Sequence, residues 1–311
     1  MRHEAQREEF VTRDARRGKI GLLRITLHGP PMYTTLISAA ALRAQLKSCI
    51  VVDCRFDLTR TDSGREAYLT AHIPGALYAH LDTDLSGPKS PHTGRHPLPD
   101  PAALAAKFSA WGIDASTQVV AYDADAGMFA SRLWWLLRWL GHTQVAVLDG
   151  GFKAWQNAGF SVDTEIPAPR ATTFVGQPHN DLLVTTADVA ELVKRSEWRL
   201  LDARAPERFR GEVEPIDPVA GHVPGARNHP FAWNMGADGR LLVATELKHK
   251  LEQSLDGVAS NRSVMMCGSG VTACHNLLAL EIAGLAGAKL YAGSWSEWLR
   301  DPSRPVAKGQ D

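Results

Sequence analysis

The feature that most constrains the fold is a sequence pattern that occurs twice, once in each half of the chain. Each copy has an apolar strand ending in an acid, a His-Ile/Val-Pro-Gly-Ala motif, a second apolar strand, and a glycine-led segment that ends in tryptophan. The first copy comprises 50–55, 71–76, 119–123 and 150–155, and the second comprises 200–204, 221–226, 264–267 and 293–298. One match could arise by chance, but four in the same order indicate a duplicated domain.

In both halves, short apolar strands alternate with stretches of helical pattern. Helices are expected at 102–111, 131–140, 187–196 and 273–283. This alternation predicts an α/β fold in which each domain has a mainly parallel sheet with helices on both faces. Ligands of such sheets bind beyond the carboxyl ends of the strands, so we expect the functional site at that edge.

Changes in composition give the expected domain boundaries. The first residues are charged and end in Gly29-Pro30-Pro31, which indicates a disordered extension or a misassigned start codon. Three prolines mark a linker between the two copies. The expected parts are an extension at 1–31, a first domain at 32–162, a linker at 163–182, a second domain at 183–302 and a tail at 303–311.

Composition argues against several classes of protein. The chain has 34 basic and 34 acidic residues and a formal net charge of zero, so we expect neither a nucleic-acid nor a membrane partner. No run is long and apolar enough to span a bilayer. The four cysteines form neither the CxxC pairs of a zinc site nor a disulfide framework, so we expect no metal and a reducing, cytoplasmic location.

The leading candidate for a reactive group is Cys267. It follows the apolar run 264–266 and opens a Gly-rich loop that leads into an apolar helix. Loop N–H groups and the N-terminal end of a helix both favour an anion, so we expect Cys267 to be a thiolate nucleophile. The alternative, a buried inert thiol, is the reading we favour for Cys274 further along the helix.

Taken together, these motifs resemble the two-domain rhodanese sulfurtransferases over about residues 32–301. The paired His-Ile/Val-Pro-Gly-Ala motifs, the loop Cys-Gly-Ser-Gly-Val-Thr-Ala at 267–273 and Gly-Ser-Trp-Ser-Glu-Trp at 293–298 carry the resemblance. It implies two tandem rhodanese-like domains, of which the first is inactive because Asp123 stands where the second has Cys267. The implied reaction passes a sulfane sulfur from a small donor to cyanide, a thiol or thioredoxin through a Cys267 persulfide, with no metal and no organic cofactor.

The resemblance also implies how the donor is bound. The binding loop would consist of Gly268, Gly270, Val271 and Thr272, and both glycines are expected at φ values that other residues resist. Arg208 matches one of two arginines that hold the carboxylate of mercaptopyruvate in the family. The second would fall within 212–219, where the chain has no arginine, and Arg210 is an alternative cation.

A Ser-His-Asp relay that protonates the departing pyruvate enolate is implied by Ser269, His96 and Asp82. Because His96 and Asp82 belong to the first domain, the site is expected to form between the domains. Arg95, beside His96, would add a cation to that cleft.

The donor and the function class leave alternatives. The loop sequence at 267–273 resembles that of 3-mercaptopyruvate sulfurtransferases. The lack of a second arginine in 212–219 instead favours thiosulfate or another donor. We expect mercaptopyruvate with accompanying thiosulfate activity, and thiosulfate as main donor is the alternative. A cysteine phosphatase needs an arginine six residues after its cysteine, where this chain has Ala273. We therefore reject that function. A non-catalytic sulfur-relay or regulatory binding module and a thiol hydrolase with His96 as base remain as other classes.

Overall fold

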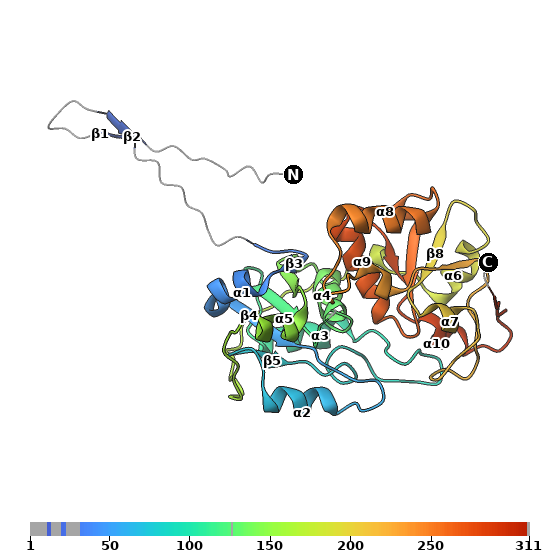
Figure 1. Ribbon diagram of the computed structural model, residues 1–311, viewed down its shortest axis with the longest axis horizontal. Coiled ribbons are helices and arrows are strands. Elements are labelled where there is room, and N and C mark those ends of the chain that lie inside the picture. The colour runs from blue at the N-terminus through green and yellow to red at the C-terminus, as the bar shows by residue number, and fades with distance from the viewer. Residues whose placement is uncertain (1–10, 14–19, 23–31, 126, 310–311) are drawn as a thin grey trace. The chain divides into compact units, whose positions relative to one another are not determined.

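The computed structural model describes residues 11–13, 20–22, 32–125 and 127–309, and Figure 1 shows its ribbon. The chain divides into two units, 1–32 and 33–311. In the first unit, β1 (Val11–Arg13) and β2 (Ile20–Leu22) pair antiparallel. The rest of the extension that we expected to be disordered, 1–31, lies outside the described residues.

The first half of unit 33–311 holds a parallel five-stranded sheet in the order β3-β7-β6-β4-β5. Alternate side chains of its strands enter two separate apolar clusters, with Val52 and Val119 in one and Val51 and Val120 in the other. Both faces are therefore buried beneath helices, as in α/β folds. The elements are β3 (Leu36–Ile37), α1 (Ala39–Gln45), β4 (Cys49–Asp53), α2 (Ser63–Thr70), β5 (Leu77–Tyr78), α3 (Pro101–Ala110), β6 (Gln118–Tyr122), α4 (Ala130–Trp139), β7 (Val145–Leu148) and α5 (Gly151–Asn157).

The second half holds a parallel sheet in the order β11-β10-β8-β9. An isolated parallel bridge between Leu183 and Leu290 takes the place that β3 has in the first sheet, so the strand order repeats. Its elements are α6 (Thr186–Leu192), β8 (Arg199–Asp202), α7 (Pro206–Phe209), β9 (Ala226–Asn228), α8 (Ala244–Leu255), β10 (Ser263–Met266), α9 (Thr272–Ile282), β11 (Lys289–Leu290) and α10 (Ser294–Trp298). The predicted fold, two α/β domains with parallel sheets covered by helices, is confirmed.

Three of the four expected helices begin and end within one residue of α3, α4 and α9. The fourth, expected at 187–196, is shorter because α6 ends at Leu192. Its start is fixed by a capping box in which Thr185 and Asp188 bond each other's backbone N–H. After Leu192 the chain tightens into i→i−3 hydrogen bonds, from Lys194 N–H to Glu191 O and from Arg195 N–H to Leu192 O.

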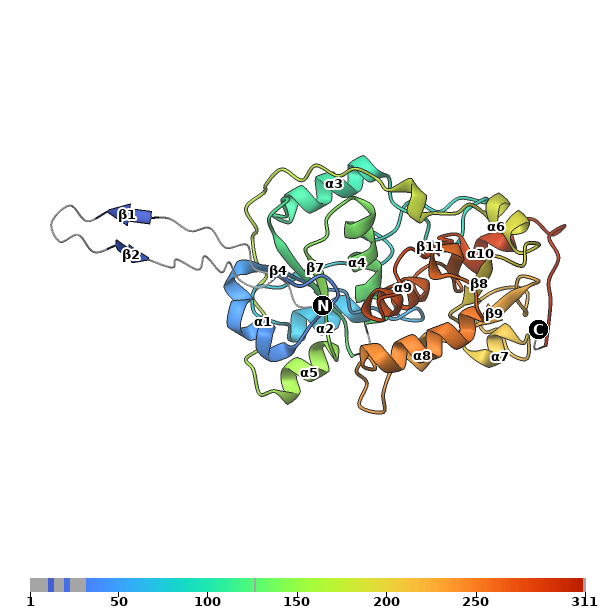
Figure 2. The ribbon, with the colours of Figure 1, turned by 90° about the horizontal axis from the view of Figure 1, so that it is seen from above.

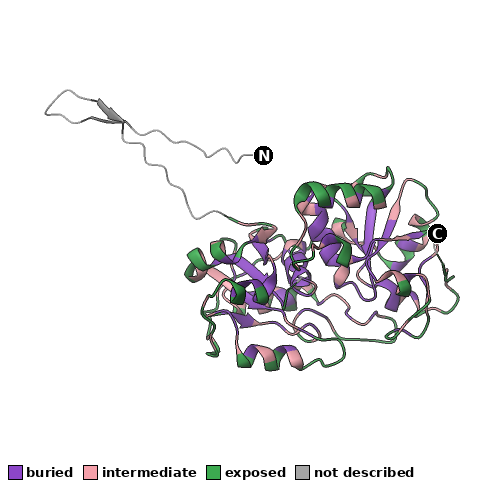
Figure 3. Cartoon of the chain, in the orientation of Figure 1, coloured by how far each residue is buried: buried purple, intermediate pink, exposed green. Residues whose placement is uncertain are grey.

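The two domains share one apolar core. Helix α4 of the first domain packs against α9 of the second, as both views of the ribbon show (Figures 1 and 2). Leu133 and Leu137 on α4 belong to the same buried cluster as Leu277 and Leu280 on α9. Burial of both sheets is visible in Figure 3. Because cores are close-packed, residues that the two domains present at this contact are held in fixed relative positions.

A buried ion pair recurs at the strand end of each copy. Arg55 Nη2 lies 2.6 Å from Asp53 Oδ2, and Arg204 Nη2 lies 2.7 Å from Asp202 Oδ2. Each arginine also donates to the carbonyl that precedes the repeated histidine, Ala71 O or Gly221 O. The repetition supports a scaffolding role for these pairs. Among the described residues, no helix has the length and apolarity needed to cross a membrane.

Candidate active site

Cys267 is the first residue after β10, at the carboxyl edge of the second sheet. Its Sγ accepts hydrogen bonds from the N–H of Gly270 at 3.1 Å and of Ser269 at 3.4 Å, just before α9 begins at Thr272. Its own N–H donates to Ser294 Oγ at 3.0 Å. Two N–H groups aimed at one sulfur stabilise negative charge there. The loop can therefore hold a thiolate and, equally, a persulfide anion.

The two loop glycines are needed for different reasons. Gly270 has a φ of +79°, and a Cβ there would lie 2.3 Å from Ala292 O. Gly268 is not in the left-handed region, so the expectation of such backbone at both glycines is wrong for this residue. A Cβ on Gly268 would instead lie 2.7 Å from Arg95 Nη2. Gly268 thus gives a cation from the other domain room to approach the loop.

A cavity of about 170 Å³ lies beside the cysteine, and both domains line it. Several water molecules of about 30 Å³ each would fill it, so it suits a small donor rather than a nucleotide or a lipid. Cys267 is 2% exposed. Lining residues include the expected Cys267, Gly268, Ser269, Val271, Thr272 and Arg208, together with Arg95, Met128 and Phe129 from the first domain.

The three residues of the expected relay lie together across the domain contact. His96 Nδ1 is 2.7 Å from Ser269 Oγ, and His96 Nε2 is 3.3 Å from Asp82 Oδ1. Because a carboxylate is a hydrogen-bond acceptor, its position next to Nε2 favours the tautomer in which Nε2 carries the ring proton. In the neutral ring, Nδ1 then accepts the hydroxyl proton of Ser269. Ser269, His96 and Asp82 thus form a continuous row of polar groups that leads from the cavity, which Ser269 lines, into the first domain.

His96 is held in its neutral form. Burial and, next, the charge of Arg132 lower the pKa of His96 to about 3, although the nearby Asp82 carboxylate offsets part of their effect. At neutral pH the imidazole is therefore a proton acceptor.

The low pKa of His96 makes stability depend on pH. Unfolded His96 would take up a proton near its ordinary pKa of about 6.5, whereas folded His96 stays neutral down to about 3. The unfolded state thus binds more protons between pH 6.5 and pH 3. The contribution of His96 to the free energy of unfolding is therefore fully present above pH 6.5 and is lost as the pH falls. We expect the unfolding free energy to drop by about 2 kcal/mol more between pH 7 and pH 5 in the wild type than in His96→Asn. Urea unfolding at both pH values measures this difference.

The exposed residue His92 in the same segment offers the matched control. His92→Asn should keep the pH dependence of the wild type. Equal pH dependence in wild type and His96→Asn would contradict the neutral state of the buried ring.

Sequence reasoning missed Arg132, a fully buried cation on α4. Its guanidinium donates to the carbonyl oxygens of Leu85 at 3.3 Å, His96 at 3.2 Å and Gly270 at 3.2 Å. It therefore ties the histidine segment of one domain to the cysteine loop of the other. The available signal was an arginine near the start of a helix that is otherwise largely apolar and has one further arginine, Arg138.

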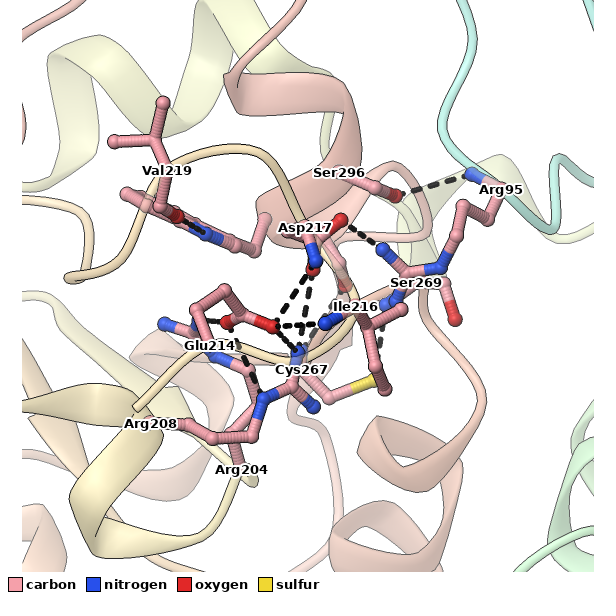
Figure 4. Close-up of polar contacts among 12 residues, drawn as sticks. Arg95, Arg204, Arg208, Glu214, Ile216, Asp217, Val219, Cys267, Ser269 and Ser296 are labelled. Carbon is pink, nitrogen blue, oxygen red and sulfur yellow. Dashed lines mark hydrogen bonds and ion pairs between the residues drawn. The ribbon is translucent and has the colours of Figure 1, made fainter. Parts of the chain in front are cut away.

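An arginine–acid cluster lies beside the cysteine loop, and Figure 4 shows its members Arg95, Arg204, Arg208, Glu214 and Asp217. Its sixth member is Asp202, which pairs with Arg204. Arg208 Nη2 donates to Glu214 Oε1 at 2.6 Å and to Asp217 Oδ2 at 3.3 Å. Arg95 donates from the other domain to Asp217 Oδ1. Burial raises the pKa of Asp217 against the pull of both arginines, so its charge is costly to maintain.

The alternative cation Arg210 lies elsewhere. It donates to Glu212 Oε1 at 2.7 Å and borders a different cavity, with Phe209, Arg227 and Trp233. Arg95 and Arg208 supply the three heavy atoms nearest to a Cβ built on Gly268, at 2.7, 3.7 and 3.8 Å. Arg208 and Arg95 thus line the cavity beside Cys267, whereas Arg210 does not border it.

Two further residues behave as structural groups. Cys274 is fully buried and donates to Gly270 O at 3.3 Å, and burial raises its thiol pKa to about 12, so it is a protonated packing residue. In the first domain, Asp123 occupies the position of Cys267 and accepts from the N–H of Gly127, Phe129 and Ala130. That domain keeps the anion-binding loop and fills it with its own carboxylate. Within the described ranges, no cluster of three or more His, Cys, Asp or Glu side chains is arranged to hold a metal ion.

Comparisons with known proteins show which family the chain resembles in sequence and fold. The family model of the rhodanese-like domain matches residues 38–158 and 185–301. The chain is 50% identical to a probable 3-mercaptopyruvate sulfurtransferase of Pseudomonas aeruginosa, over 88% of this chain and 98% of that protein. It is 40% identical to a putative thiosulfate sulfurtransferase of Mycobacterium tuberculosis, over 88% and 97%. A solved 3-mercaptopyruvate sulfurtransferase from Leishmania major superposes with a TM-score of 0.76 at 32% identity, over 85% of this chain and 74% of that chain.

Proposed function

The chain belongs to the rhodanese family of sulfurtransferases, and we propose that its preferred donor is 3-mercaptopyruvate, whose sulfur Cys267 accepts as a persulfide. The observation that carries this choice is the Ser269–His96–Asp82 chain beside Cys267. Mercaptopyruvate must move a proton from sulfur to carbon as it reacts, whereas thiosulfate has no proton to move. A proton relay next to the sulfur is useful only for the first kind of donor.

The first half-reaction follows from the contacts of the site. The Cys267 thiolate attacks the sulfur of mercaptopyruvate, so an S–S bond forms while the donor's C–S bond breaks and its electron pair passes to carbon. Ser269 and His96 take the thiol proton and return it to the carbon of the resulting enolate. Thiolate and mercaptopyruvate thereby become persulfide and pyruvate with no net gain or loss of protons.

The second half-reaction regenerates the enzyme. Cyanide, a thiol or a thioredoxin-type dithiol attacks the outer sulfur, and the Cys267 thiolate leaves. The N–H groups of Ser269 and Gly270 stabilise the persulfide before this step and the thiolate after it. The four free cysteines fit a reducing compartment, so we place the enzyme in the cytoplasm, where such thiols are abundant.

Donor binding rests on Arg208 and Arg95. Both border Gly268 and both line the cavity beside Cys267. A guanidinium presents paired N–H groups that match a carboxylate, so the two cations would hold the donor's carboxylate with its sulfur toward Cys267. Thiosulfate, the donor named for one relative, is proposed as a second, poorer substrate.

Replacing Arg208 by glutamine should lower kcat/KM for mercaptopyruvate by about 10- to 100-fold, mostly through KM, because one charge-assisted hydrogen bond to the carboxylate is lost. The assay measures pyruvate release with cyanide as acceptor, and sulfite release from thiosulfate in parallel. Arg210→Gln removes a charge two residues away that borders a different cavity, and it should leave kcat/KM unchanged. Equal losses in both variants would contradict carboxylate binding by Arg208. No turnover of either donor by the wild type would contradict the proposed function itself.

A further inference from the structure

The segment 212–219 reverses the usual arrangement of apolar and charged side chains. Its apolar residues Val213, Ile216 and Val219 are 51%, 41% and 42% exposed. Its acids Glu214 and Asp217 each have side chains only 3% exposed. Burying a charge is unfavourable unless it is paired. The segment is therefore built to deliver two carboxylates to the arginines beside the active-site loop.

Glu214 fixes the shape of this segment. Its Oε1 accepts from the N–H groups of Ile216 and Asp217, both at 3.1 Å, while it also pairs with Arg208. At the far end, Trp295 Nε1 donates to Val219 O at 3.0 Å. Asp217 is thus held between two anchored positions and is not free to swing out of the cluster.

Asp217 bridges a cation from each domain (Figure 4). Its Oδ1 accepts from Arg95 of the first domain, and its Oδ2 accepts from Arg208 of the second. Arg95 Nε is buried and has no hydrogen-bond partner among the described residues. The two arginines therefore still have donor capacity, but Asp217 neutralises part of their charge.

The charges of the arginine–acid cluster balance, since three guanidinium groups face three carboxylates in its ion pairs. An incoming anion thus meets directed N–H donors without a large positive potential. Such a site suits a monoanion. A dianion would gain about twice as much as a monoanion from each additional unit of positive charge.

We propose that Asp217 determines donor selectivity: by bridging Arg95 and Arg208 it neutralises the donor pocket, so that a monoanionic carboxylate donor is preferred over dianionic thiosulfate. This inference rests on the proposed function and goes beyond it, because it assigns the preference to a residue that does not contact the reacting sulfur.

The test compares kcat/KM for mercaptopyruvate and for thiosulfate in the wild type and in Asp217→Asn. The amide keeps the shape of the carboxylate and removes its charge. We expect the thiosulfate-to-mercaptopyruvate ratio to rise on the order of tenfold, mainly through a lower KM for thiosulfate. Glu212→Gln is the matched control, because it removes a negative charge from the same segment at an exposed position paired with Arg210. Its ratio should stay that of the wild type.

A second variant covers the case in which Asp217→Asn fails to fold. Arg95→Gln removes one of the two cations that Asp217 bridges, so the pocket becomes more negative. The thiosulfate-to-mercaptopyruvate ratio of kcat/KM should therefore fall. An unchanged ratio in both variants, or a shift of the same sign in both, would overturn the assignment while the wild type still turned over its donors. A wild type that used neither donor would instead overturn the proposed function.

Discussion

Replacing Cys267 by serine is expected to lower turnover of both mercaptopyruvate and thiosulfate by a factor on the order of 10⁴ or more. A hydroxyl in place of the thiolate cannot form a persulfide, and both donors must pass through that intermediate. The side chain is 2% exposed and sits beneath two N–H groups, so serine fits the same space with little disturbance. Pyruvate and sulfite release, each measured with cyanide as acceptor, report the loss.

The matched control is Cys49→Ser, which makes the same chemical change at the start of β4, in the other domain. That variant should retain full activity with both donors. Residual turnover of more than a few per cent in Cys267→Ser would mean that another group carries the sulfur.

Replacing His96 by asparagine should separate the two donors. Without the imidazole, Ser269 loses the acceptor that lies 2.7 Å from its hydroxyl. Mercaptopyruvate then lacks the group that moves its proton from sulfur to carbon, and kcat is expected to fall by about 10²- to 10⁴-fold. Thiosulfate needs no such proton transfer, so its kcat should change by less than about tenfold.

Parallel pyruvate and sulfite assays on one preparation of His96→Asn make this comparison, because any general loss of folded protein lowers both rates alike. Asp82→Asn should show the same selectivity with a smaller effect, since Asp82 contacts the ring at 3.3 Å and acts through it. Similar losses with both donors would show that His96 supports the structure rather than the proton transfer.

The fold was largely predictable from the sequence because the duplication repeats its strands and turns in the same order. Fully apolar strands such as 119–122 predict a sheet that is covered on both faces, and the structure confirms this prediction. The predicted end of the helix at 187–196 was wrong because of local hydrogen bonding. In α6, i→i−3 hydrogen bonds after Leu192 end the helix early. Nothing in the pattern of 187–196 distinguishes those two outcomes.

The site was predictable where it is local and unpredictable where it depends on contacts between domains. The loop around Cys267 could be described from Gly268 to Thr272 because chain neighbours build it. The role of Gly268 could not, because it depends on the approach of Arg95 from the other domain. Arg132 was missed for the same reason, since its three carbonyl partners are distant in sequence.

The charge around the cysteine loop is the clearest example of a property that could not be predicted from the sequence. The sequence shows that 212–219 contains no arginine. It does not show that this segment buries its acids and exposes its apolar residues, which only the structure reveals. Burial and pairing with Arg95 and Arg208 decide the charge of the pocket, and both are properties of the folded chain.

The most direct test of the central claim, a persulfide on Cys267, is the intact mass of the protein after incubation with mercaptopyruvate and desalting without reductant. The account predicts a gain of the mass of one sulfur atom, which cyanide removes and which Cys267→Ser does not acquire. Thiosulfate should give the same gain more slowly. A wild type that acquires no sulfur from either donor, or a Cys267→Ser variant that acquires it equally well, would contradict the account.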